Sequence, residues 1–232
     1  MIVTIHQPEH LPWLGFFHKM TSADLFVCLD TVQYRKNYFQ NRNRVLTVNG
    51  PAWVTVPVLT RGHTDSSIGE MRISPDDRWP KKYWATLQQA YGKHPFFPTH
   101  AERFREIIER PWERLVDLNL ALIKAFLEVF GLSVPIRMAS ELDCQGSASQ
   151  LLADICQRLR ASVYLSGPSG RDYLDESFFA QAGIAVRYHD FSHPTYPQKG
   201  AGEFVSNLSA FDLLMNVGPE GRRYILPRAR TA

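Results

Sequence analysis

The sequence has few cysteines, no long apolar run and little net charge, and each shortage excludes a class of protein. The cysteines Cys28, Cys144 and Cys156 are scattered without C-x-x-C spacing, which fits reduced thiols rather than a disulfide framework. No run of about 18 apolar residues is present. The chain also does not open with a basic segment and an apolar core, as a signal peptide does. These features predict a cytoplasmic protein without a membrane span.

The charge balance is close to neutral. The 232 residues include 26 lysines and arginines against 23 acidic residues, which leaves a net charge of +3. A nucleic-acid-binding domain usually carries a stronger basic excess, so we expect no nucleic-acid partner. An anionic small molecule fits this balance. A chain of this length with 44% hydrophobic residues can bury a proper core, either alone or as a homodimer.

Polar, ionisable residues follow the first two apolar runs of the chain. Residues 2–5 are the first run, and the polar residues after it are His6, Gln7, Glu9 and His10. An aromatic, helix-like stretch leads to the second run, residues 25–29, which ends on Asp30. This order is typical of a strand–helix–strand unit. In open α/β sheets ligands bind at the edge where the strands end, so the sequence predicts a ligand site there.

The rest of the chain alternates between helical and strand patterns. The expected helices cover residues 80–91, 99–109, 111–130, 147–159, 176–182 and 205–217, and the expected strands cover residues 163–165 and 184–188. Residues 45–48 and 53–56 flank Asn49-Gly50, a hairpin signal, and Ser147 with Gln150 forms a capping-box pattern. We therefore expect an α/β fold: an open, mostly parallel Rossmann-like (nucleotidyltransferase-like) sheet flanked by helices, with a β-hairpin and a helical insertion.

The expected domain organisation follows from this pattern. Residues 1–226 form a single α/β domain, in which residues 44–130 make a small lobe. Residues 227–232 form a basic, flexible tail.

Several blocks of the sequence, spread from end to end, resemble one family. In the first 43 residues these are HQP (6–8), LPWLG (11–15), AD (23–24), DTVQY (30–34) and QNRN (40–43). Further along they are WVTVP (53–57), YLSGPSGRDY (164–173), HPTYPQ (193–198) and residues 208–218 with an S-x-x-D-L-L core. On these blocks the chain resembles the WbqC-like family. The resemblance implies a transferase role in bacterial surface-polysaccharide (O-antigen) synthesis, because members are associated with such gene clusters.

Three residues are the catalytic candidates: His6, His10 and Asp30. The two histidines bracket the first strand-to-helix turn, where backbone N–H groups favour anions. Asp30, at the end of the second strand, is the best general-base candidate. The turn is similar to the histidine turn of adenylate-forming and nucleotidyl-transferring enzymes such as pantothenate synthetase, but Pro12 and Trp13 stand where a second histidine would follow. The alternative is that these polar residues only tie the turn down by hydrogen bonds.

Two further segments carry the expected substrate contacts. Basic and aromatic residues alternate after Asp30; arginine binds phosphates in a bidentate manner, and aromatic rings stack on bases and sugars. The small residues after position 165 allow the backbone to approach a phosphate closely. The substrate-binding candidates are Gln7, Tyr34, Arg35, Lys36, Gln40, Asn41, Arg42, Ser166, Gly167, Ser169, Arg171, Tyr173 and His193.

A metal site is an alternative interpretation of the histidines. His6-x-x-x-His10 and His189-x-x-x-His193 would have to meet around zinc together with Asp30. Neither histidine pair needs to lie on a helix; Pro8 interrupts the first spacing, and Pro194 directly follows the second. We therefore favour ligand binding and assign no metal ligand.

We expect a transferase of surface-polysaccharide synthesis that passes an acyl or aminoacyl group to the amine of a nucleotide-activated amino sugar. The family resemblance implies the pathway, and the chemistry of the candidate residues suggests the reaction. No cofactor is assigned, although ATP or an acyl thioester fits the donor side. Three alternatives stay open: a non-catalytic protein that binds a sugar nucleotide or carrier, an ATP-dependent acid–amine ligase or nucleotidyltransferase-like enzyme, and a metal-dependent hydrolase.

Overall fold

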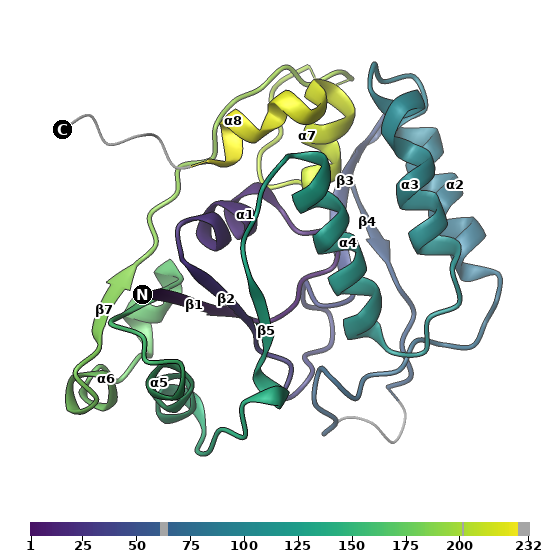
Figure 1. Ribbon diagram of the computed structural model, residues 1–232. Coiled ribbons are helices and arrows are strands. Elements are labelled where there is room, and N and C mark those ends of the chain that lie inside the picture. Colours follow the sequence, from purple (N-terminus) through teal and green to yellow (C-terminus); the bar gives the residue numbers. More distant parts are fainter. Residues whose placement is uncertain (61–64, 201, 227–232) are drawn as a thin grey trace.

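A five-stranded parallel sheet forms the centre of the protein. The computed structural model describes residues 1–60, 65–200 and 202–226 (Figure 1). The strands are β1 (Ile2–His6), β2 (Leu25–Cys28), β5 (Ile136–Met138), β6 (Val163–Ser166) and β7 (Ala185–Tyr188), in the spatial order β5-β2-β1-β6-β7. All four neighbouring pairs are parallel. The expected α/β fold with an open Rossmann-like sheet is therefore confirmed.

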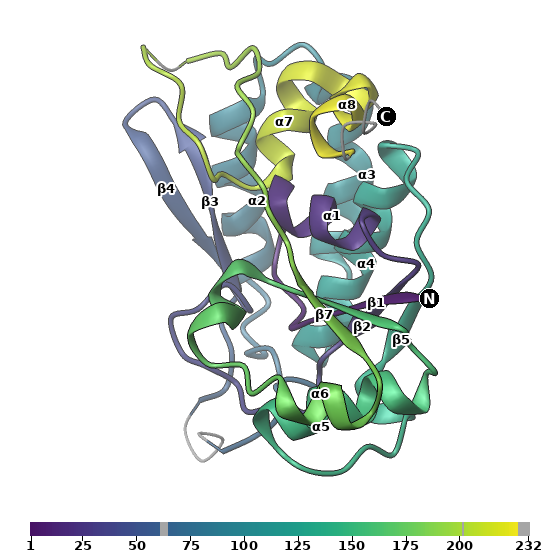
Figure 2. The ribbon, with the colours of Figure 1, turned by 90° about the vertical axis from the view of Figure 1, so that its left-hand side faces the viewer.

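Helices cover both faces of the sheet (Figures 1 and 2). The helices are α1 (Leu14–Thr21), α2 (Trp79–Tyr91), α3 (Phe97–Glu109), α4 (Leu115–Val129), α5 (Ala148–Arg158), α6 (Ser177–Gln181), α7 (Ala210–Val217) and α8 (Arg222–Ile225). The short 3-10 turns are η1 (Ala139–Glu141), η2 (Pro168–Asp172) and η3 (Gly218–Gly221). Within the described ranges no helix is long and apolar enough to cross a membrane.

The side chains of the strands alternate between two hydrophobic clusters. Phe26 and Cys28 belong to a large cluster shared with α1, α2, α3, α4 and α7. Val27 and Leu29 point the opposite way, into a smaller cluster with α5 and α6. This period of two follows from the pleat of a strand. Because both of their faces are buried, the central strands β1, β2 and β6 read as short apolar runs that end where polar residues begin.

The β-hairpin stands apart from the main sheet. It consists of β3 (Arg42–Thr47) and β4 (Gly50–Thr55), and it lies beside α2 (Figures 1 and 2). The expected hairpin is confirmed, but its turn is formed by residues 48–49 instead of 49–50, because Thr47 pairs with Gly50. Gly50 has a φ of +94°, a conformation that glycine adopts without strain.

Several expected boundaries are wrong, and each has a local reason. The helix expected at 111–130 begins at Leu115, because Arg114 pairs with Arg72 and the Leu115 N–H binds the Met71 carbonyl. The helix expected at 205–217 begins at Ala210, because Ser209 pairs with Trp13. Ser147 does precede α5, but its side chain makes no capping hydrogen bond. The tail expected at 227–232 lies outside the described residues.

Candidate functional site

The strand order creates a switch point at the centre of the sheet. From β1 the chain moves outward through β2 and β5 on one side, and then returns to β6 and β7 on the other side. The carboxyl ends of β1 and β6 are therefore neighbours whose connections run in opposite directions. His6 ends β1, and Gly167 directly follows β6. In open α/β sheets this crevice is the usual position of a bound ligand.

His6 lies beside a buried carboxylate at this crevice. Its Nδ1 donates to the Gln7 carbonyl at 2.9 Å, and its Nε2 lies 3.9 Å from Oε1 of Glu9. The other carboxylate oxygen of Glu9 is buried without a hydrogen-bond partner. Burial lowers the pKa of His6 to about 3, helped by the charge of Lys19, although 32% of the side chain stays exposed. Burial raises the pKa of Glu9 to about 8, against the opposing effect of Lys19.

Lys19 reaches back from α1 into the same crevice. The residue is 5% exposed, and its Nζ donates to the Ile5 carbonyl of β1 at 3.0 Å. Burial lowers the pKa of Lys19 to about 7, while Glu9 acts in the opposite direction. Lys19 and Glu9 influence each other's pKa without direct contact. Burying two such groups lowers the stability of the fold, and arrangements of this kind are found at functional sites.

His189 completes this group from the end of β7. Burial lowers its pKa to about 4, and the charges of His18 and Lys19 act in the same direction. Its Nε2 lies 2.6 Å from Nδ1 of His18. We call His6, Glu9, Lys19 and His189 the Lys19 cluster. The cluster offers a lysine and a carboxyl group whose pKa values lie near neutral pH, together with two neutral imidazoles, which suits acid–base chemistry at neutral pH.

His10 lies in the core and not in the crevice. The residue is fully buried, its Nδ1 is 2.9 Å from Oδ1 of Asn119, and its Nε2 is 2.7 Å from the Tyr83 hydroxyl. Burial lowers its pKa to about 4. Both ring nitrogens therefore have protein partners, as in the alternative that hydrogen bonds tie the turn down. His10 fastens the first turn to α2 and α4.

Asp30 lies at a strand end, as expected, but it is also occupied. Its Oδ1 accepts from the Ser140 N–H at 3.0 Å, and its Oδ2 accepts from the Ser140 hydroxyl at 2.6 Å. The residue is 5% exposed. Asp30 therefore joins the end of β2 to η1, which follows the neighbouring strand β5. The structure does not bring Asp30, His6 and His10 together as one catalytic group.

The basic aromatic segment after Asp30 is tied to the turn that follows β1. The Gln40 side chain donates to Oε1 of Gln7 at 2.7 Å and accepts from the Arg35 N–H at 2.8 Å. Arg35 lies over the Tyr38 ring at 5.1 Å. On the hairpin, Arg42 lies over the Trp53 ring at 4.2 Å. The segment is thereby held at the carboxyl edge of the sheet.

A row of aromatic rings connects Arg35 and Arg42. Phe39 contacts both Tyr38 and Trp53, with ring centroids 5.6 and 5.7 Å apart. We call Arg35, Tyr38, Phe39, Arg42 and Trp53 the aromatic patch. Tyr38 is 43% exposed and Trp53 is 45% exposed. In the part of the chain that the structure describes, neither arginine has an acidic partner. The patch is available to an anionic, planar ligand.

The remaining candidates of this segment divide into exposed and structural positions. Lys36 is exposed beside the aromatic patch. Tyr34 is buried, and its N–H donates to the Ser66 carbonyl. Asn41 is buried as well, and its amide donates to the Val56 carbonyl at 2.8 Å. Tyr34 and Asn41 therefore shape the loop rather than face solvent.

The loop after β6 lies opposite the aromatic patch. Ser169, Arg171 and Tyr173 are exposed, and Arg171 lies over the Tyr188 ring at 4.3 Å. Burial raises the pKa of Tyr173, and the nearby phenol of Tyr38 adds to this shift. Ser166 is buried where Gly170 passes so closely that a Cβ there would lie 2.1 Å from its Oγ. The two predicted substrate segments thus approach one another across the sheet edge.

His193 belongs to a different surface. Its ring stacks on Trp13, with centroids 6.4 Å apart, and it lines a groove of about 700 Å³ together with His18 and Arg223. Further along this segment, Tyr196 and Gln198 donate to Oδ2 of Asp212 at 2.7 and 2.8 Å. The motifs HPTYPQ and S-x-x-D-L-L therefore fasten the C-terminal segment to α7.

The metal interpretation has no counterpart in the described residues. His10 is bound to Tyr83 and Asn119, and Asp30 is bound to Ser140. Across residues 1–60, 65–200 and 202–226, no three histidine, cysteine or acidic side chains are grouped to hold a metal ion.

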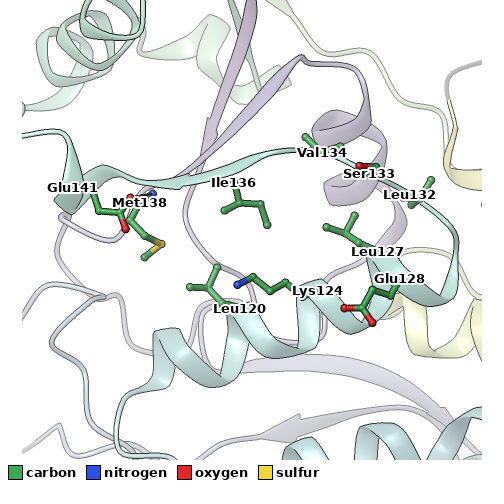
Figure 3. A pocket seen from close by; sticks show the side chains of 10 residues that line it. All are labelled: Leu120, Lys124, Leu127, Glu128, Leu132, Ser133, Val134, Ile136, Met138 and Glu141. Atoms are coloured by element: carbon green, nitrogen blue, oxygen red, sulfur yellow. Dashed lines mark hydrogen bonds between the residues drawn. The ribbon is translucent and has the colours of Figure 1, made fainter.

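A second groove lies away from this edge, between α4 and β5 (Figure 3). It measures about 430 Å³, and its lining is largely aliphatic, with Leu120, Leu127 and Ile136 among its residues. Lys124 extends across it from α4. No predicted site residue lines this groove, so the chemistry points to the carboxyl ends of β1 and β6 instead.

Sequence reasoning missed the buried part of the site. Glu9 stands out as a polar residue in the first turn, but no motif gives it a role. Lys19 lies in the run Phe16–Met20, where its charge interrupts an otherwise apolar helix face. A lysine in such a position is the available signal, because lysine is almost never fully buried without a partner.

The comparisons with known proteins agree with the family blocks of the sequence. The WbqC-like protein family matches residues 7–224. The uncharacterized protein Rv1507c of Mycobacterium tuberculosis is 34% identical over 225 residues, which cover 96% of this chain and 96% of that protein. No solved structure matches the chain. With nearly its whole length matched, the chain belongs to the WbqC-like protein family.

Proposed function

We propose that the protein is a transferase of bacterial surface-polysaccharide synthesis that passes an acyl or aminoacyl group to the amine of a nucleotide-activated amino sugar. One observation carries this proposal. The Gln7–Gln40 hydrogen bond joins the end of β1, where the Lys19 cluster lies, to the aromatic patch. A single ligand can therefore place its nucleotide on the patch and its reactive group at the cluster.

Each part of the site supports one part of such a substrate. Arg35, Lys36 and Arg171 are exposed cations that suit phosphate oxygens, and Tyr38 and Tyr173 are exposed rings that suit a base or sugar. At the crevice, a basic group can take the proton that an attacking amine must lose. His6 faces solvent in part and contacts the substrate in this scheme. With a pKa of about 3 it acts as a neutral hydrogen-bonding group. The base is one of the buried groups of the Lys19 cluster that lie behind His6.

The test uses pairs of nucleotide sugars that differ in one amine, for example uridine diphosphate glucosamine and uridine diphosphate glucose. Selective binding of the amine form raises the melting temperature, because a ligand that binds only the folded state stabilises it. Mass spectrometry after incubation with acyl thioesters, or with ATP and a free acid, then detects the acylated sugar. Absence of any mass change with both donor types, despite binding, contradicts the transferase.

A non-catalytic sugar-nucleotide binding protein is the second candidate. The observation that favours it is that His10 and Asp30 both have protein partners and are withdrawn from chemistry. The variant Glu9→Gln, which removes a titratable group behind His6, separates the two candidates. Retained affinity with lost turnover indicates an enzyme, whereas a binding protein shows no turnover before or after the change.

A further inference from the structure

Gly167 and Lys19 leave a small recess at the switch point. Gly167 has φ −68° and ψ 164°, values open to any residue, so its backbone does not require glycine. A Cβ at this position would lie 3.9 Å from Nζ of Lys19, and no other non-adjacent heavy atom of the described chain comes within 4 Å of it. Because Gly167 has no side chain, open space remains beside it, and the nearest group to that space is the amine of Lys19.

That amine has hydrogen-bonding capacity left over. A lysine ammonium carries three N–H donors, and in the described residues the Nζ of Lys19 uses one, toward the Ile5 carbonyl. The groups that face it are His6 from β1, Glu9 from the following turn and His189 from the end of β7. Both histidines are neutral at physiological pH, and Oε2 of Glu9 is buried without a partner. The recess thus holds a cation-forming group and an unpartnered carboxylate, without a ligand for either.

We propose that this recess is a proton-linked anion subsite, in which Lys19 and the Gly167 backbone receive a phosphate group of the substrate while Glu9 balances the charge of the empty site. The inference deepens the proposed function, on which it rests only for the source of the phosphate, a nucleoside diphosphate. Near neutral pH the Glu9–Lys19 pair of the empty site holds a single proton, which keeps the buried pair neutral, and at pH 8.5 it holds none. When the anion enters, a proton taken from water or buffer forms the third N–H bond of the Lys19 ammonium, and no bond between heavy atoms changes.

The test is calorimetric titration with inorganic pyrophosphate in buffers of different ionisation heat. At pH 8.5, above the lowered pKa of Lys19 near 7 and the raised pKa of Glu9 near 8, binding should take up close to one proton. At pH 6 the uptake should be close to zero. Lys19→Met should abolish the uptake and weaken binding about 10- to 100-fold, the range for a hydrogen bond to a charged group. Lys81→Met, which removes an exposed lysine on α2, is the matched control.

Gly167→Ala tests the recess without removing a charge. The added methyl fits the backbone conformation and meets only Nζ of Lys19, so the variant should fold normally and still lose binding at least about tenfold. Gly202→Ala, where a Cβ meets nothing within 4 Å, should bind like the wild type. Pyrophosphate that fails to bind the wild type, binds Lys19→Met equally well, or binds without proton uptake at pH 8.5 overturns the proposal.

A parallel titration with uridine diphosphate separates the sources of the phosphate. If a nucleotide is the ligand, it should bind more tightly than pyrophosphate, and Tyr38→Ala should remove that gain. Equal affinities point to free pyrophosphate or phosphate as the source. Because neither probe carries the amino sugar of the proposed substrate, the subsite can succeed where the amino-sugar transferase fails, and the reverse.

Discussion

Nδ1 of His18 and Nε2 of His189 lie 2.6 Å apart, which joins the last turns of α1 to the end of β7. A bond between two imidazoles requires at least one of them to stay neutral, because only an unprotonated ring nitrogen accepts a hydrogen bond. Burial lowers the pKa of both rings, that of His189 from 6.5 to about 4. The hydrogen bond between the two rings therefore forms at neutral pH, and protonation of both rings in acid breaks it.

The first prediction concerns acid stability. Below about pH 6.5 the unfolded chain takes up a proton on His189 before the folded protein does, so the free energy of unfolding falls between pH 6.5 and pH 4. One such histidine contributes up to about 1.4 kcal/mol per pH unit. Urea denaturation at pH 7 and pH 5 measures the loss, and His189→Gln should reduce it. An unchanged pH dependence in that variant contradicts the assignment.

The second prediction concerns His10. Replacing it with Ala leaves the Tyr83 hydroxyl and Oδ1 of Asn119 without their His10 partner in the core, which should cost about 2–4 kcal/mol of stability. His100→Gln, at a partly exposed histidine on α3, should change the stability by less than about 0.5 kcal/mol. A stable His10→Ala variant that loses only turnover would instead restore His10 as a catalytic residue.

The third prediction concerns Asp30. Asp30→Ala removes both hydrogen bonds to Ser140 and should destabilise the fold by about 2–4 kcal/mol. Asp30→Asn keeps one acceptor and should lose roughly half as much. Thermal or urea unfolding of the two variants checks the order. If Asp30→Asn is fully stable but inactive, the carboxylate has a chemical role beyond this contact.

The fourth prediction concerns the aromatic patch. Trp53→Ala removes an exposed ring that lies against Arg42 and should weaken nucleotide binding by about 5- to 30-fold, the effect of losing about 1–2 kcal/mol of stacking and cation–π energy. Val48→Ala, at an 83% exposed position on the same hairpin, should bind normally. Calorimetry with uridine diphosphate decides; equal affinity in both variants excludes the patch as the nucleotide surface.

The central strands β1, β2 and β6 were predictable because they are buried on both faces and read as apolar runs closed by polar residues. The strand that was not predicted is β5, which has three residues, Ile136–Met138, with Arg137 in the middle, and forms an edge of the sheet. Such a short strand forms because β2 pairs with it, and no local sequence pattern indicates that pairing. The displaced starts of α4 and α7 have the same origin, because the backbone just before each helix pairs with a residue that is distant in the sequence.

The site was predictable to the extent that strand ends were. His6 and Gly167 lie where the sequence places them, at the ends of β1 and β6. The occupation of His10 and Asp30 was not predictable, because their partners Asn119 and Ser140 lie 109 and 110 residues away in the chain. The sequence signals Lys19 only as a charge in an apolar helix face, and its position in the crevice depends on how α1 packs across β1.

The strand order also sets when the site can exist during synthesis of the chain. β1 can meet β2 as soon as the first thirty or so residues have left the ribosome, but its other neighbour, β6, begins at residue 163. The crevice between His6 and Gly167 is thus completed only when β1, the first strand to be synthesised, pairs with β6, which is synthesised much later. A chain that ends before β6 has His6, Glu9 and Lys19, yet lacks the proposed site until that pairing is made.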